Sequence, residues 1–210
     1  MNIAILIYGR LNKAIDQYDN IIKHVICEQN VDIFCSSDNS TNIKEFIMKY
    51  NPISYINDEI ILDNDILNYY KQFRKPFETN VENAIKHFMN KQRVYQLLKT
   101  YIEKTGKKYD IIMSLRVDLQ FSSKINFQYP QKNTIYIPYG NDYRNGINDQ
   151  IAYGDQNTME KYNNIISQCK NILLYDLSKY GFHPENLTAE NIKLHGLNIH
   201  RFPLTYKIVR

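Results

Sequence analysis

The sequence predicts an α/β protein with a mostly parallel central sheet, and three observations support this. Short apolar runs recur along the chain and stop at glycine, polar or charged residues. Segments whose apolar residues have helical spacing lie between these runs. The chain has 210 residues, of which 43% are hydrophobic and 23% charged, so it is long enough to enclose one substantial core.

The first elements form a βαβ unit. Residues 3–8 are a continuous apolar run that predicts a central strand, and Gly9 ends it. Residues 13–27 carry apolar side chains at helical spacing. Residues 31–35 predict a second strand, closed by the polar run 36–40.

The next segment predicts a helix over residues 42–50 that stops before Pro52. A third strand is expected at residues 53–56, with an extension at 60–62. Apolar positions at helical spacing then predict one long amphipathic helix over residues 80–106, ended by a glycine.

Residues 109–121 predict the strand that follows this helix, and residues 134–139 predict another. The polar stretch 140–147 contains two glycines and predicts a flexible loop. Residues 148–155 combine a short apolar strand with flanking acids, and a helix is expected from there to about residue 180.

The chain should close with a helix that Pro184 opens and a strand at residues 199–209. No internal repeat and no Pro/Ser-rich linker divides the sequence, so a single domain over residues 1–210 is expected.

Charge and cysteine content exclude several classes. The formal net charge is +4 with scattered basic residues, whereas nucleic-acid binding needs a denser basic stripe. Cys27, Cys35 and Cys169 form no CxxC pair, which argues against a zinc site and for a reducing compartment. No window approaches the roughly 20 apolar residues that span a bilayer. A cytoplasmic protein is therefore expected.

The most informative residues are Arg116 and Asp118, at the end of the run 109–121. Side chains alternate along a strand, so the two residues should share one face. Charges are tolerated at the carboxyl end of a parallel strand, where open α/β sheets bind ligands. Such a pair suits a divalent cation or a phosphate-bearing substrate. A purely structural ion pair between Arg116 and Asp118 is the open alternative.

Three further segments could carry chemistry. Tyr8, Gly9 and Arg10 follow the first strand, where backbone amides can face a phosphate, but they lack the GxGxxG and GxxxxGK[ST] patterns. Asp149 follows the glycine-bearing loop and could act as a base or cap a turn.

The third segment contains His183 and Glu185, on either side of Pro184. Capping of the final helix is the structural interpretation for both residues. The functional alternative is that Glu185 binds an acceptor hydroxyl.

The order of these segments resembles a family, the small GT-A type glycosyltransferases of large DNA viruses and some bacteria, which includes the chlorella-virus sugar transferase domain. Five segments spread over nearly the whole chain carry the resemblance. They are residues 3–10, 31–34, 109–119, 148–154 and 183–185.

The resemblance implies a GT-A-like, Rossmann-type three-layer α/β/α sandwich, with a nucleotide-binding half at residues 1–121 and an acceptor-side half at 122–210. It implies transfer of a sugar from a nucleotide-sugar donor, UDP-linked, to a glycan or protein acceptor. The expected roles are nucleotide binding for Tyr8, Gly9, Arg10 and Arg116, metal binding for Asp118, the base for Asp149 and acceptor binding for His183 and Glu185.

The expected cofactor is a divalent metal, Mn²⁺ or Mg²⁺. The sequence departs from the family in one place, because Arg116-Val117-Asp118 stands where the family has DxD. Arg116 could therefore neutralise the phosphates itself. For a viral protein the expected location is the host cytoplasm. Two other functions stay open: a non-catalytic α/β binding module, and a nucleotidyltransferase or phosphohydrolase that uses the same carboxylates.

Overall fold

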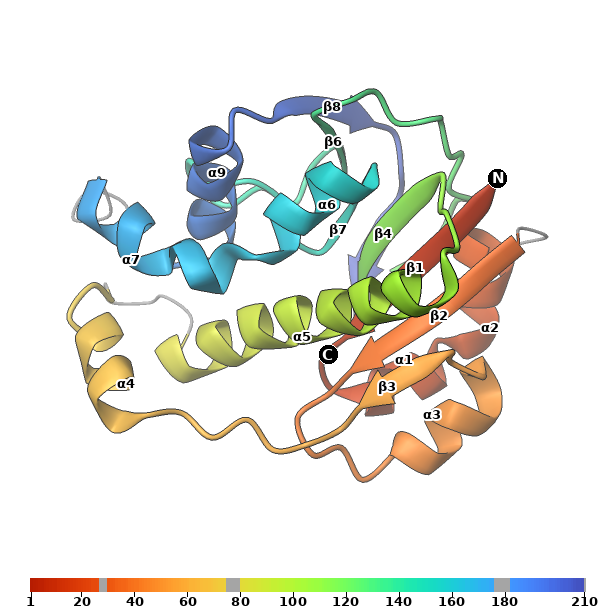
Figure 1. The fold of residues 1–210 in the computed structure, drawn as a ribbon, viewed down its shortest axis with the longest axis horizontal. Helices are drawn as coiled ribbons and strands as arrows, with labels where there is room; N and C mark the ends of the chain where they lie inside the picture. Colours follow the sequence, from red (N-terminus) through yellow and green to blue (C-terminus); the bar gives the residue numbers. More distant parts are fainter. Residues whose placement is uncertain (27–29, 75–79, 176–181, 210) are drawn as a thin grey trace.

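A central seven-stranded sheet organises the computed structural model, which describes residues 1–26, 30–74, 80–175 and 182–209. The strand order is β3-β2-β1-β4-β7-β6-β8 (Figure 1). The strands are β1 (Asn2–Tyr8), β2 (Asn30–Ser36), β3 (Ser54–Ile56), β4 (Ile111–Arg116), β6 (Thr134–Pro138), β7 (Ile151–Gly154) and β8 (Asn198–Phe202). β7 is antiparallel to both neighbours, and the other strands run in one direction.

Helices cover both faces of this sheet. One face carries α1 (Leu11–Asp16), α2 (Tyr18–Ile21), the π-helix η1 (Ile22–Ile26) and α3 (Ile43–Tyr50). The other carries α5 (Val81–Thr105), α6 (Gln156–Asn163) and α9 (Pro184–Leu194). The predicted class, a layered α/β fold with a mostly parallel sheet, is confirmed (Figure 1).

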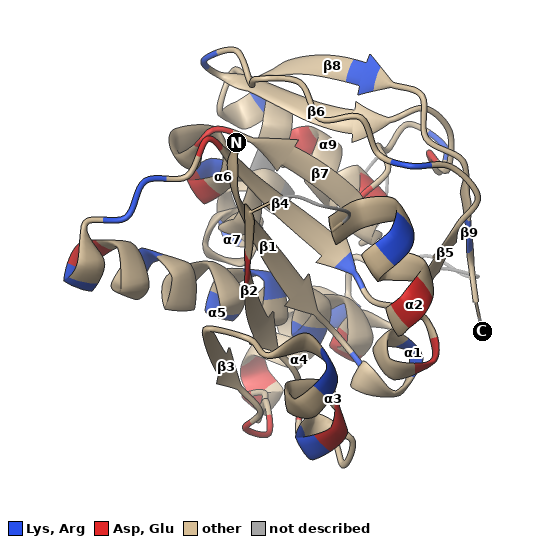
Figure 2. Ribbon diagram, turned by 90° about the vertical axis from the view of Figure 1, so that its right-hand side faces the viewer, with Lys and Arg blue, Asp and Glu red and all other residues tan. Residues whose placement is uncertain are grey.

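Alternation along β1 divides the core into two parts. Ile3, Ile5 and Ile7 belong to the cluster beneath α1 and α3, while Ala4, Leu6 and Tyr8 belong to the cluster beneath α5. Because both faces are covered, residues 3–8 of β1 are all buried and apolar or aromatic, which explains the continuous run in the sequence. Figure 2 shows charged residues mainly on helices and at strand ends, with β1 and β7 free of them.

A third apolar cluster joins α4 (Asn64–Lys71) and α7 (Ile165–Tyr175) to the first turns of α5 and to α9. Buried members include Tyr70, Phe88 and Leu187. This cluster lies beside the sheet, at the end of α5 that carries its N-terminus (Figure 1). It therefore anchors that end of α5, which contributes to the site described below.

The long helix is confirmed with both of its predicted ends. The Asn80 side chain accepts a hydrogen bond of 2.8 Å from the Glu82 amide and caps α5. Gly106 ends the helix with a φ of 68°, a conformation that glycine adopts without strain.

Several predicted elements differ in extent. The helix expected at 13–27 begins earlier and is broken into α1, α2 and η1, with residue 27 outside the described ranges. The expected extension at 60–62 has no regular structure. The helix expected up to residue 180 is divided into α6 and α7, and residues 176–181 lie outside the described part.

The prediction of one strand over 109–121 is wrong in a way that affects the site. β4 ends at Arg116, the chain bends at residues 117–118, and β5 (Leu119–Phe121) pairs with β9 (Tyr206–Ile208) in a separate two-stranded sheet. The expected final strand is divided in the same way between β8 and β9. The bend brings Arg116 and Asp118 into direct contact.

The seven-stranded sheet takes β1 to β4 from residues 1–121 and β6 to β8 from residues 122–210. The two expected halves of the chain thus share one sheet. Among the residues that the structure describes, no helix is both long and apolar enough to cross a membrane.

Candidate functional site

The carboxyl ends of β1 and β4 lie side by side. Tyr8, the last residue of β1, is the register partner of Arg116, the last residue of β4. The Arg116 amide also donates a 2.9 Å hydrogen bond to the Gln150 carbonyl, next to β7. The structure therefore gathers Tyr8, Arg116 and the segment around Asp149 at one edge of the sheet, where open α/β sheets bind ligands.

Gly9 turns the chain at this edge with a φ of 114°. A side chain there is strained because L residues rarely adopt this conformation. The Gly9 amide donates a hydrogen bond of 3.1 Å to the Ser36 carbonyl at the end of β2. Arg10 follows as an exposed residue that precedes α1.

Arg116 and Asp118 form a two-pronged ion pair. The guanidinium Nε lies 2.6 Å from Oδ1 of Asp118, and Nη2 lies 2.7 Å from Oδ2. Their side chains are 33% and 20% exposed, so the pair sits at the surface rim of the sheet edge. Burial lowers the pKa of Arg116, but the hydrogen bonds and charge of Asp118 outweigh it and the net pKa is raised.

Asp149 is buried and is paired with a histidine of α5. Its Oδ2 lies 3.1 Å from Nε2 of His87, and the side chains are 3% and 18% exposed, respectively. Burial alone would raise the pKa of Asp149. The contact with His87, together with the charges of His87, Lys91 and Arg116, lowers that pKa to about 2. Asp149 is thus a fixed anion, and His87 is the more accessible member of the pair.

Lys91 lies one helical turn beyond His87 on α5 and is fully buried. Its ammonium stands 3.8 Å from the centroid of the Tyr162 ring, and no residue that the structure describes forms a hydrogen bond with it. Burial lowers the pKa of Lys91 to about 7, although Asp149 opposes that shift. A cation in this position is held by the aromatic ring and by the nearby carboxylate.

Two tyrosine hydroxyls hold the backbone of Asp149 in place. Tyr8 Oη donates to the Asp149 carbonyl at 3.2 Å, and Tyr162 Oη does so at 3.5 Å. The Tyr8 ring meets the His87 ring edge to face at 5.3 Å between centroids. Burial and Asp149 raise the pKa of Tyr8. We call the set Tyr8, His87, Lys91, Arg116, Asp118 and Asp149 the sheet-edge cluster.

The loop of residues 140–147 packs against the start of α9. The rings of Tyr143 and His183 stack with centroids 4.2 Å apart, and the Ile147 amide donates to the Glu185 carbonyl at 3.0 Å. A Cβ on Gly146 would lie 2.5 Å from the Glu185 carbonyl carbon, so this approach requires glycine. His183 and Glu185 also form an ion pair with each other. Pro184 and Glu185 lie in the first turn of α9, as the capping interpretation expects, whereas the His183 side chain at the N-cap makes no capping hydrogen bond.

The donors around Asp118 do not fit a divalent cation. Such a cation needs several oxygen or nitrogen ligands. Both oxygens of Asp118 are engaged by Arg116, and Asp149 is buried against His87. Within residues 1–26, 30–74, 80–175 and 182–209, no group of three His, Cys, Asp or Glu residues could hold a metal ion.

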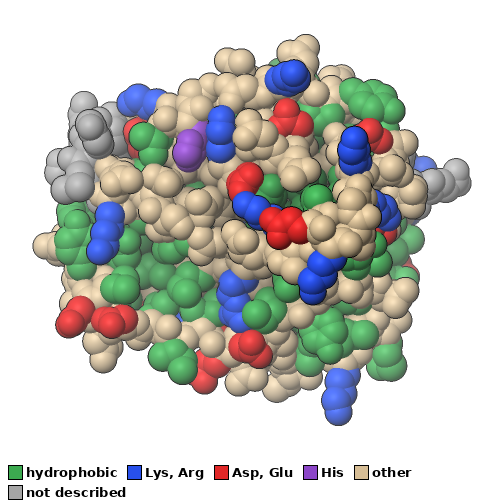
Figure 3. All heavy atoms as spheres, in the orientation of Figure 1, with side chains coloured by type: hydrophobic (Ala, Val, Ile, Leu, Met, Phe, Trp, Pro, Cys, Tyr) green, Lys and Arg blue, Asp and Glu red, His purple; other side chains and the backbone are tan. Residues whose placement is uncertain are grey.

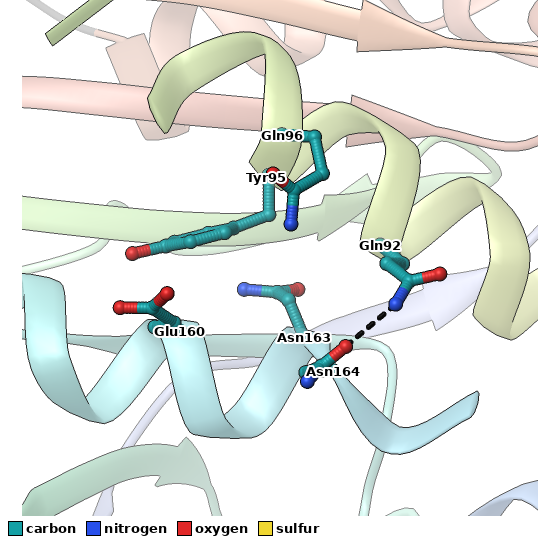
Figure 4. A pocket seen from close by; sticks show the side chains of 6 residues that line it. All are labelled: Gln92, Tyr95, Gln96, Glu160, Asn163 and Asn164. Carbon is teal, nitrogen blue, oxygen red and sulfur yellow. Dashed lines mark hydrogen bonds between the residues drawn. The ribbon is translucent and has the colours of Figure 1, made fainter. Parts of the chain in front are cut away.

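A small pocket lies elsewhere, between α5 and α6. Figure 4 shows it lined by Gln92, Tyr95, Gln96, Glu160, Asn163 and Asn164, with Gln92 donating to Asn164. None of these residues belongs to the sheet-edge cluster. On the face that α5 crosses, basic and acidic side chains are interspersed and do not form one basic surface (Figure 3).

Sequence reasoning missed His87, Lys91 and Tyr162. The sequence predicts the long helix only as an amphipathic helix and assigns no role to His87 or Lys91. One signal was present: Lys91 falls on the same stripe as the buried residues Ala84, Phe88, Tyr95 and Leu98. A lysine on the apolar stripe of a helix indicates a buried charge with a function or a dedicated partner.

The fold and the sheet-edge cluster define a layered α/β protein with a charged site at the carboxyl ends of its parallel strands. The chain belongs to the family described as a domain of unknown function, DUF7796, whose model matches residues 18–205. His87, Lys91, Arg116, Asp118 and Asp149 lie inside the matched range, and Tyr8 lies before it. No curated protein matches the chain.

Proposed function

We propose that the protein is a glycosyltransferase of the GT-A kind, which transfers a sugar from a nucleotide-sugar donor to a hydroxyl acceptor. The observation that carries the proposal is the pairing of Tyr8 with Arg116 at adjacent strand ends, next to β7, which runs antiparallel to its neighbours in the seven-stranded sheet. A cation fixed at this edge suits a diphosphate. Uridine diphosphate is the nucleotide to test first.

In this proposal the leaving diphosphate is stabilised by the guanidinium of Arg116. A preorganised cation contributes most where negative charge develops during the reaction. The guanidinium is already oriented by Asp118 and partly exposed. Tyr8 is fully buried and supports the site from beneath, whereas the turn at Gly9 and the exposed Arg10 would face the nucleotide.

The proton of the acceptor hydroxyl is taken up by the pair of His87 and Asp149. We expected Asp149 to act as the base, but a buried carboxylate with a pKa of about 2 holds a proton poorly. The more exposed His87 ring is better suited to receive the proton, while Asp149 orients the ring and balances its charge. His183 and Glu185 are proposed to border the acceptor, glycan or protein, under the loop that packs on them.

The cytoplasm remains the proposed compartment. Cys35 and Cys169 are both free and buried, in keeping with a reducing environment. Cys27 lies outside the described residues.

The test is release of nucleoside diphosphate from a panel of nucleotide sugars, with and without manganese, by the wild type and by Arg116→Ala. We expect release from at least one donor and a loss of about 100-fold in the variant, the usual range for removing one transition-state contact. Arg93→Ala is the matched control, because Arg93 lies on α5 and contacts Asp58 instead. No release and no binding with any donor would refute the proposal.

The ion pair of Arg116 with Asp118 also favours a second candidate, a binding module without catalysis. Such a module would bind a nucleotide sugar and release no nucleotide, and Asp118→Ala would mainly lower its melting temperature. A nucleotidyltransferase or phosphohydrolase would instead release pyrophosphate or phosphate without sugar transfer. The same panel therefore separates all three functions.

A further inference from the structure

The ion pair at the end of β4 stands where the DxD resemblance leads us to expect a metal ligand. Asp118 meets the Nε and Nη2 edge of Arg116 with both of its oxygens, at 2.6 and 2.7 Å. This fork geometry is the strongest form of an arginine–carboxylate contact. A cation bound to Asp118 through both oxygens would need the two atoms that Arg116 holds, and a cation bound through one of them would lie close to the guanidinium charge, which repels it. Arginine and metal therefore compete for Asp118.

Neighbouring groups hold Asp118 in this arrangement. Its backbone carbonyl accepts a hydrogen bond of 2.8 Å from the Val209 amide, beyond β9. Arg116 is fixed from the other side through its own amide and the Gln150 carbonyl. Both main chains are thus tied to sheets, and the pair does not depend on two free surface side chains.

The guanidinium of Arg116 retains N–H groups that are not bonded to Asp118. Arginine carries five N–H groups, and the fork to Asp118 uses the Nε and Nη2 edge. Within the described ranges no hydrogen bond occupies Nη1. The side chain is 33% exposed, so these remaining donors can meet a ligand at the rim.

We infer that Asp118 is a positioning residue that orients Arg116 toward the donor's diphosphate, and that a divalent cation has no place in this site. The inference rests on the proposed function and makes it more specific: Arg116 supplies the charge that a metal supplies elsewhere. Asp118 fixes the orientation of the Arg116 guanidinium and does not contact the nucleotide. Its negative charge weakens the attraction that Arg116 exerts on a phosphate.

Titration calorimetry with uridine diphosphate, in EDTA and in manganese, tests this on the whole protein. We expect equal affinity in both buffers. Arg116→Lys should weaken binding by about 10-fold or more, since lysine cannot form the fork and still reach the phosphate. Asp118→Asn should leave the affinity within about threefold, because asparagine keeps an acceptor oxygen for the guanidinium and removes the opposing charge. Asp118→Ala keeps no acceptor to orient the guanidinium and should weaken binding by about 10-fold.

The variants control for each other. If Arg116→Lys acted only by breaking the ion pair, Asp118→Asn, which also weakens that pair, would lower the affinity to the same degree. Arg93→Lys controls for the loss of an arginine elsewhere, and melting temperatures confirm that each variant is folded.

Three results would overturn the inference. An affinity of Asp118→Ala equal to that of the wild type would show that Asp118 does not orient Arg116. Binding that needs manganese and is abolished by Asp118→Asn would make Asp118 a metal ligand, and the proposed function would stand. No binding of this or any other nucleoside diphosphate or nucleotide sugar in either buffer would remove the proposed function, and the inference with it.

Discussion

Replacing Lys91 by methionine should stabilise the protein, and should do so in a pH-dependent way. Lys91 is fully buried, and its ammonium has no hydrogen-bond partner in the described part of the chain. Burial lowers its pKa from 10.5 to about 7. Methionine has a similar length, adapts to irregular space and carries no charge. The variant therefore avoids placing a cation in a dry site.

The magnitude follows from linkage between folding and proton binding. A fall in pKa from 10.5 to about 7, at about 1.4 kcal/mol per pH unit, corresponds to about 5 kcal/mol as an upper bound. The penalty is full below about pH 7, where Lys91 is protonated in both states. Between about pH 7 and 10.5 the unfolded chain binds more protons than the folded protein, so wild-type stability rises with pH.

Urea unfolding of both proteins measures the effect. The advantage of Lys91→Met should fall from at most about 5 kcal/mol at about pH 6 to at most about 2 kcal/mol at about pH 9. Lys104→Met is the control, since Lys104 is exposed near the end of the same helix and folding leaves it in water. The reasoning is refuted if the Lys91→Met difference is flat across this range, or if Lys104→Met shows the same pH dependence.

Two further substitutions test other contacts. Gly146→Ala should destabilise the protein by about 1–3 kcal/mol, because its Cβ would lie 2.5 Å from a backbone atom of Glu185, and a lowered melting temperature would show it. Asp149→Asn should destabilise by about 2 kcal/mol at about pH 6, since folding lowers the carboxyl pKa from 3.8 to about 2. That loss should shrink to about 1 kcal/mol at about pH 3, as the pH falls toward the folded-state pKa, and a constant loss in urea unfolding would contradict the ion pair with His87.

The strands of the central sheet could be predicted because each buried strand appears in the sequence as one short run of apolar residues. β1 is apolar at every buried position, and its two sides enter different clusters. The break after Arg116 could not be predicted, because β5 leaves the sheet to pair with β9 at residues 206–208. Leu119 pairs with Ile208, which is far away in the sequence, and the pattern of residues 109–121 contains no information about so distant a partner.

The candidate site could be predicted in part, because strand ends can be located from local sequence but the packing of a covering helix cannot. Strand-end logic places Arg116 beside Tyr8, and the loop before β7 beside both. The positions of strand ends give no information about α5, the helix that covers this face of the sheet. His87 and Lys91 reach the same sheet edge from that helix. Nor do the strand ends show that Asp149 is buried, because burial there depends on how that helix packs.

The measurement that tests the account most directly is a crystal structure of the protein with uridine diphosphate, grown in the presence of manganese. The account predicts diphosphate oxygens within hydrogen-bond distance of the Arg116 guanidinium, with Asp118 still holding the other edge of that group. A manganese ion bound to Asp118 in place of Arg116, or a nucleotide bound away from the ends of β1 and β4, would contradict it.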